Sequence, residues 1–240
     1  MLDTQSFRRH ERKYLVDRRQ LAALHERISG LLEEDVNGAA SGSYYNHSIY
    51  FDSPRYFHYS EKREGLAIRR KPRLRSYRRT IDGEPDAFFL EFKNRDSDIV
   101  WKQRQRIDQT AALGMLEGAF SVHESERPPL LEEFFYCLRR FNLVPAATVL
   151  YHRRAFGVKS TPGLRITYDS RIMGAMGAQW RGGPDGFRFS VPPALTMVEI
   201  KYDFGFPGWL AAIVRNLQME RVSVSKYALG LEAVFRPGRR

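Results

Sequence analysis

Positive charges alternate along residues 67–78, and this pattern constrains the fold more than any other stretch of the chain. Successive side chains of a β-strand point to opposite faces, so a strand here would place on one face the side chains of Arg69, Lys71, Arg73, Arg75 and Tyr77. Cations that share a face repel each other unless an anionic group lies between or opposite them. Two interpretations remain open: a solvated basic surface strand, or a strand that lines an anion-binding site.

The same alternation returns elsewhere with mixed charge. In residues 88–95, Glu91 and Lys93 alternate with Leu90 and Phe92. Comparable patterns occur in residues 9–16, 99–106, 164–169 and 197–202. A half-exposed antiparallel sheet explains such patterns. The bulky apolar faces and the helices available to cover them favour instead a sheet closed into a barrel, with apolar residues outward and charges inward.

The expected helices fall between these strands. Residues 18–32, 109–118, 128–141 and 207–217 carry helical patterns; Asp17 is the expected N-cap of the first helix. A short helix should begin at Ser53-Pro54, and residues 225–227 should open the last helix. We find no internal repeat and no linker, so residues 1–240 are predicted to form a single domain of the α+β class.

Composition limits the partners and the compartment. The formal net charge of +11 favours an anionic partner such as a nucleic acid, a phosphorylated small molecule or lipid headgroups. A barrel interior rich in Arg and Lys would be unstable when empty, which favours a polyanion, and a few carboxylates could hold a divalent metal ion. The single cysteine, the absence of a signal-peptide pattern and the lack of a long apolar run predict a cytoplasmic protein without a membrane span.

A family resemblance rests on motifs in a fixed order. They are Arg9-x-Glu11-x-Lys13-Tyr14, Ser48-Ile-Tyr-Phe-Asp-Ser53, Lys71-x-Arg73-x-Arg75-x-Tyr77, Glu91-x-Lys93, Tyr151-x-Arg153-x-Ala155-Phe156, Leu164-Arg-Ile-Thr-Tyr-Asp169, Glu199-Ile-Lys201 and Ser225-Lys-Tyr227. Together they resemble the polyphosphate polymerase (VTC, vacuolar transporter chaperone) domain of the triphosphate tunnel metalloenzyme (CYTH-like) superfamily, over about residues 8–232. The resemblance implies a closed eight-stranded antiparallel tunnel, surrounded by helices, that binds triphosphate and Mn²⁺ or Mg²⁺.

Site residues follow from the resemblance position by position. Catalytic roles are implied for Lys13, Arg73, Arg75 and Lys226. Phosphate-binding roles are implied for Lys71, Lys93, Arg153, Arg165 and Lys201, and Lys102 and Arg104 are alternative candidates for the same role. Glu199 is the implied metal ligand, and Glu11 and Glu91 are candidates either for the metal or for orienting nearby Lys and Arg side chains.

The resemblance also implies an activity and partners. Eukaryotic relatives transfer the terminal phosphate of ATP to a growing inorganic polyphosphate chain, and they carry an SPX domain and membrane helices. Neither is recognisable in these residues, so regulation of the activity is expected to come from elsewhere, including a membrane-protein partner, or to be absent. The oligomeric state is left open. Hydrolytic branches begin with Glu-x-Glu-x-Lys, whereas Arg9 replaces the first Glu here, which favours the polymerase.

Two alternatives to the polymerase remain open: a triphosphate or nucleoside triphosphate hydrolase, and a non-catalytic polyphosphate-binding module. A nucleic-acid binder is disfavoured because the basic residues are interleaved with Glu instead of forming a patch of one sign.

Overall fold

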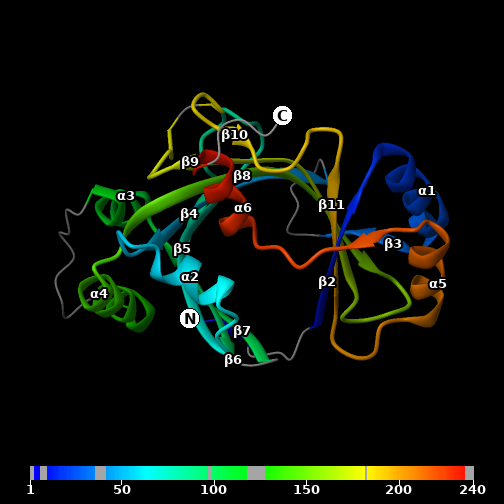
Figure 1. The fold of residues 1–240 in the computed structure, drawn as a ribbon, viewed down its shortest axis with the longest axis horizontal. Coiled ribbons are helices and arrows are strands. Elements are labelled where there is room, and N and C mark those ends of the chain that lie inside the picture. Colours follow the sequence, from blue (N-terminus) through cyan, green and yellow to red (C-terminus); the bar gives the residue numbers. More distant parts are fainter. Residues whose placement is uncertain are drawn as a thin grey trace.

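A twelve-stranded antiparallel sheet forms the body of the protein. The structure, a computed structural model, describes residues 3–5, 10–35, 42–96, 99–117, 128–181 and 183–235. The strands are β1 (Asp3–Gln5), β2 (His10–Val16), β3 (Leu32–Glu34), β4 (Ser43–Asp52), β5 (Ile68–Arg78), β6 (Ala87–Asp96), β7 (Ile99–Ile107), β8 (Val144–Val158), β9 (Arg165–Met176), β10 (Arg188–Phe189), β11 (Thr196–Tyr202) and β12 (Glu220–Arg221). Figure 1 shows that the sheet is strongly curved.

The strands follow the order β1-β7-β6-β5-β4-β8-β9-β11-β2-β12, with β3 paired to β8 and β10 to β9. Within the described ranges, no backbone hydrogen-bond ladder joins the two ends of this path. The α+β class and the antiparallel sheet are therefore confirmed, whereas the closed eight-stranded barrel is not. What the described residues show is a curved sheet whose two ends share no backbone ladder.

The helices are α1 (Arg18–Ile28), α2 (Phe57–Arg63), α3 (Gln109–Glu117), α4 (Pro129–Phe141), α5 (Gly208–Asn216) and α6 (Lys226–Phe235). Asp17 caps α1 as predicted, because its Oδ1 accepts the backbone N–H of Gln20 at 2.8 Å. The predicted helix end was wrong: α1 stops at Ile28, a 3-10 turn follows, and residues from Leu32 pair with β8. Gly30, a poor helix former, lies at this transition.

The helix after β4 also begins later than predicted. Tyr56 has a positive φ of 56°, which is incompatible with an α-helix, so α2 starts at Phe57 instead of at Pro54. Ser53 still caps it, since its Oγ accepts the backbone N–H of Phe57 at 3.1 Å. The helices predicted near residues 109, 128, 207 and 226 are confirmed, because the observed helices start within two residues of these positions.

Apolar residues on one face of the sheet are covered by two pairs of helices. Helices α3 and α4 pack on Phe51, Leu74 and Leu90, on β4, β5 and β6. Helices α1 and α5 pack on the apolar face of β2, β8, β9 and β11, and the two pairs lie at opposite sides of the molecule (Figure 1). Arg73 and Arg75 flank Leu74, so by strand alternation they point to the other face. The predicted division into an apolar covered face and a charged face is confirmed.

Helix α6 lies within the curve of the sheet, against the charged face (Figure 1). A pair of glycines permits close contact, because a Cβ added at Gly174 of β9 would lie 2.5 Å from Cα of Gly230 of α6. A Cβ added at Gly230 would lie 2.8 Å from Cγ2 of Val149 on β8, and Val149 shares its face with Arg153. Helix α6 therefore brings its first residue, Lys226, toward the charged side chains.

Candidate functional site

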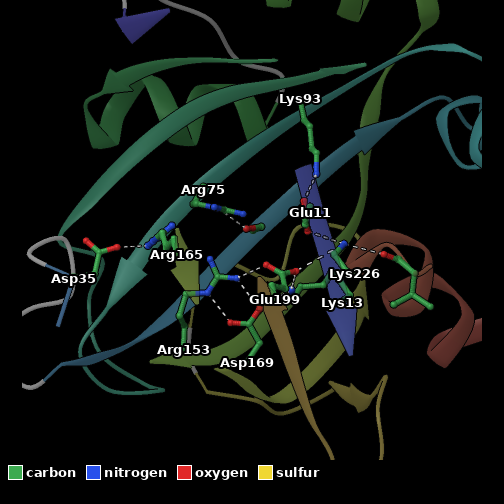
Figure 2. A network of polar contacts seen from close by, with 12 residues as sticks. Glu11, Lys13, Asp35, Arg75, Lys93, Arg153, Arg165, Asp169, Glu199 and Lys226 are labelled. Carbon is green, nitrogen blue, oxygen red and sulfur yellow. Dashed lines mark hydrogen bonds and ion pairs between the residues drawn. The ribbon is translucent and has the colours of Figure 1, made fainter. Parts of the chain in front are cut away.

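Two buried carboxylates, Asp169 and Glu199, form one centre of the charged face (Figure 2). Arg153 lies opposite Asp169 in the β8–β9 register and donates two hydrogen bonds of 2.6 Å to its carboxylate oxygens. Arg153 also reaches Glu199 Oε2 at 3.1 Å. Lys226 Nζ lies 2.6 Å from Asp169 Oδ2 and 2.5 Å from Glu199 Oε1. Each carboxylate is thus shared by the same two cations; we call these four residues the Glu199 cluster.

Strand β2 adds an alternating pair of charges to this cluster. Lys13 lies opposite Glu199 and Glu11 lies opposite Lys201, because β2 and β11 are in antiparallel register. Lys13 Nζ lies 3.1 Å from Glu11 Oε1 and 3.8 Å from Glu199 Oε1, and donates to the carbonyl of Val224 at 2.9 Å. The predicted Lys13, Glu11, Lys201 and Glu199 therefore occupy one site.

A side-chain contact links distant strands of the path. Lys93 on β6 points toward Glu11 on β2, with Nζ 3.7 Å from Oε2 (Figure 2). These strands lie near opposite ends of the strand order and share no backbone ladder. The charged faces of these two parts of the sheet therefore approach each other at this contact.

Glu91, whose side chain is fully buried, forms a second centre. Its Oε2 accepts from Arg73 Nε at 2.7 Å and lies 3.6 Å from Arg75 Nε. Its Oε1 contacts Arg104 at 3.3 Å and also Lys102. The register explains this arrangement, since Glu91 lies opposite Arg73 on β5 and opposite Arg104 on β7. We call these five residues the Glu91 cluster.

A row of lysines crosses the same three strands beside the Glu91 cluster. Lys71 on β5 lies opposite Lys93 on β6, which lies opposite Lys102 on β7. The side chains of Lys93 and Lys102 are 45% and 37% exposed. Like charges placed directly opposite each other destabilise a sheet, and a bound anion would relieve this repulsion.

The cations around the two buried glutamates lower the pKa of each. Burial alone would raise the pKa of Glu199, but Lys226, Lys13 and Arg153 outweigh burial and hold that pKa well below its usual range. Glu91 is affected in the same way by Arg75, Arg73 and Lys102. Both carboxylates are therefore ionised at neutral pH.

For two lysines, burial outweighs the attraction of nearby carboxylates, so the pKa of each is lowered. Burial lowers the pKa of Lys102 to about 7, and the charges of Arg75 and Arg73 act in the same direction against the attraction of Glu91. Burial also lowers the pKa of Lys201 to about 8. The cationic forms of these side chains are poorly stabilised by the protein alone, so an added anion would favour their protonation.

A metal ion would find few carboxylates here. No group of three or more His, Cys, Asp or Glu side chains arranged for a metal occurs among the residues that the structure describes. Mg²⁺ is commonly held by one or two carboxylates together with substrate phosphates, and Glu199 and Glu11, which both contact Lys13, fit that donor set. Glu91 is separate from this pair and has four cationic partners, so its metal role stays a prediction.

Most sequence-predicted site residues belong to the two clusters or to the row of lysines. Arg165 is an exception, because its guanidinium pairs with Asp35 at 2.5 Å (Figure 2). Lys71 lies with Nζ 5.3 Å from the ring centre of Tyr227 on α6. Arg9, which replaces the first Glu of the hydrolase motif and so favours the polymerase, lies outside the described residues.

Sequence analysis missed Asp169 as a site residue. The alternation of Arg165, Thr167 and Asp169 could have revealed it, since it places Asp169 on the face of Arg165. It also missed Tyr50, whose hydroxyl accepts from Arg73 at 3.1 Å and whose ring stacks on that of Tyr227. No pattern in the sequence marks the Tyr50–Tyr227 contact, because it joins a strand to a helix far away in the chain.

Comparison with solved structures found low similarity at high coverage. The PH1819 protein from Pyrococcus horikoshii OT3 is 16% identical with a TM-score of 0.49, over 93% of this chain and 98% of that one. HpAC1 from Hippeastrum, for which a dominant triphosphatase activity is reported, is 14% identical with a TM-score of 0.48, over 93% and 96% of the two chains. A search of curated protein sequences found no significant match.

Comparison with protein families gave a match over nearly the whole chain. The matching family model is the VTC domain, over residues 8–235. That range contains both carboxylate clusters, the row of lysines and helix α6. The chain belongs to the VTC domain family.

Proposed function

We propose that this protein is a polyphosphate polymerase, which transfers the terminal phosphate of ATP to a growing inorganic polyphosphate chain with the help of Mn²⁺ or Mg²⁺. The observation that carries this proposal is the Glu199 cluster together with the adjacent Lys13: a metal could bind its carboxylates, and phosphate oxygens could accept hydrogen bonds from Arg153, Lys226 and Lys13. Membership of the VTC domain family supports the same reaction class.

The transfer itself needs positioning and charge neutralisation more than covalent help from the protein. An oxygen of the terminal phosphate of the chain attacks the γ-phosphorus of ATP, the bond between that phosphorus and the β–γ bridging oxygen breaks, and ADP leaves. Lys13, Arg73, Arg75 and Lys226 are the proposed groups that neutralise charge at the reacting phosphates. A metal held by Glu199 and Glu11 would neutralise further phosphate charge when bound.

The remaining cations would hold phosphates on either side of the reacting group. Arginine can contact phosphate oxygens in pairs, whereas lysine acts as a compact charge. Arg153 and Lys201 would serve near Glu199, and Lys93, Lys102 and Arg104 along the other strands. We further propose that the space between the sheet ends is the tunnel, closed by side chains such as Lys93 and Glu11 where the backbones are not paired.

Incubation of the purified chain with ATP and Mn²⁺ or Mg²⁺ tests the proposal, with polyphosphate followed on gels and ADP and phosphate measured alongside. A polyphosphate ladder with matching ADP is the expected result. The variant Glu199→Gln should produce no ladder. The control variant Glu26→Gln, which is changed at an exposed position, should remain active. Free phosphate without chains would replace the polymerase with a hydrolase.

Anion binding without any product would leave a non-catalytic polyphosphate-binding module. Affinity for single-stranded RNA that polyphosphate cannot displace would support a nucleic-acid binder instead. The cytoplasmic location and any membrane-protein partner stay predictions. No helix within the described segments is long and apolar enough to cross a membrane.

A further inference from the structure

Asp52, a fully buried residue at the end of β4, is a hub of hydrogen bonds outside the phosphate-facing set. Its Oδ1 accepts the backbone N–H groups of Ser53 and His58, each at 2.8 Å. Its Oδ2 accepts the backbone N–H of Tyr59 at 3.0 Å and the hydroxyl of Tyr227 at 2.5 Å. One carboxylate therefore ties the start of α2 to the start of α6.

Tyr227 directly follows Lys226 in the chain and is linked to the Glu91 cluster through Tyr50. Its ring stacks on Tyr50 with centres 4.9 Å apart and planes inclined by 28°. The Tyr50 hydroxyl accepts from Arg73 of the Glu91 cluster at 3.1 Å. Through Asp52, Tyr227 and Tyr50, the first turn of α6 is thus fixed relative to the Glu91 cluster as well as to the Glu199 cluster.

Lys226 requires such a support because its charge sits at the end of a flexible four-carbon chain. In the free protein, Asp169 and Glu199 hold its ammonium. Both contacts can form only while the first turn of α6 stays close to β9 and β11, so a shift of that turn would draw Nζ away from both carboxylates. Burial and the adjacent Asp52 carboxylate raise the pKa of Tyr227, so its hydroxyl remains a donor.

We propose that Asp52 and Tyr227 are positioning residues that hold the start of α6 so that Lys226 reaches the reacting phosphates. They contact no substrate themselves. The catalytic consequence rests on the proposed function, whereas the positioning of Lys226 is a property of the free protein. The two can therefore be tested separately.

Lysine labelling tests the positioning without any substrate. Acetylation of Lys226 by acetic anhydride is mapped by mass spectrometry and normalised to the exposed Lys159. Tyr227→Phe removes one hydroxyl and should increase labelling of Lys226 about fivefold, since a buried hydrogen bond has a modest net effect. The matched control is Tyr59→Phe, which removes a hydroxyl bonded to Glu232 at 3.0 Å on the same helix, six positions along the chain, and should leave Lys226 unchanged.

A double-mutant cycle then tests action through Lys226. Binding of metal-free tripolyphosphate, measured by calorimetry, should weaken about fivefold in Tyr227→Phe. In the Lys226→Met background the same change should have no further effect, because the group that it positions is gone. Equal weakening in both backgrounds would identify a general structural role and overturn the proposal.

The remaining outcomes are also decisive. Unchanged labelling of Lys226 in Tyr227→Phe overturns the inference whatever the activity of the protein. If the wild-type protein does not bind tripolyphosphate, the proposed function fails while the labelling result still decides the positioning. If Tyr227→Phe does not fold, Asp52→Asn carries both measurements, with the same results expected because it disturbs the same bond.

Discussion

Glu91 offers the sharpest test of how the buried cations of the site are neutralised in the free protein. Its fully buried side chain contacts Arg73, Arg75, Lys102 and Arg104, so Glu91→Gln removes the negative charge that separates these cations. Removing one partner from a buried ion-pair network costs about 3–5 kcal/mol. For a chain of this length, about 1 kcal/mol corresponds to a change of about 2–4 °C in Tm. We therefore expect Glu91→Gln to lower Tm by about 6–20 °C.

Tripolyphosphate should reverse much of this loss. A ligand present at about 100 times its Kd stabilises a protein by about 2.7 kcal/mol. The variant offers cations that are no longer neutralised by Glu91, so its gain in unfolding free energy on adding metal-free tripolyphosphate should exceed the gain of the wild-type protein.

The assays are thermal unfolding and urea unfolding, both followed by circular dichroism in phosphate-free buffer with and without tripolyphosphate. Glu26→Gln, at an exposed position of α1, controls for the loss of a negative charge. The reasoning is refuted if Glu91→Gln unfolds at the wild-type urea concentration, or if tripolyphosphate stabilises both proteins equally.

Three further predictions concern pH and packing. The pKa of Glu199 is lower in the folded than in the unfolded state, so the contribution of Glu199 to stability is present above about pH 4.5 and is lost as pH falls through the folded pKa. On acid titration, Glu199→Gln should therefore lose less unfolding free energy than the wild-type protein. Lys102 has a pKa of about 7 in the free protein and must be protonated to attract phosphate, so tripolyphosphate affinity should fall from pH 7 to 9, and Lys102→Met should flatten this dependence in calorimetry. Gly174→Ala would push a Cβ against Gly230, so urea unfolding should reveal a loss of about 1–3 kcal/mol. The control Gly205→Ala should not show this loss, since nothing lies within 4 Å of a Cβ there.

Local patterns predicted the strands well. Alternation along residues 68–78 identified which side chains share a face, and the structure places Leu74 under α4 while Arg73 and Arg75 contact Glu91 on the other side. Strand alternation follows from backbone geometry alone, so it needs no knowledge of neighbouring strands. Helix ends were less predictable, as at Ile28 and Phe57, because pairing of residues 32–34 with β8 and the conformation of Tyr56 decide them.

The sequence by itself determined that this chain has strands with one apolar and one charged face, and that Lys and Arg greatly outnumber carboxylates on several of them. It also determined membership of a family, since motifs in a fixed order need no coordinates. The tertiary structure alone decided the partners: Asp169 beside Lys226, Glu11 beside Lys93, and Asp52 beside Tyr227. These pairs join residues that are far apart in the chain, and contacts of that kind depend on strand order, register and the curvature of the sheet, which no local pattern specifies.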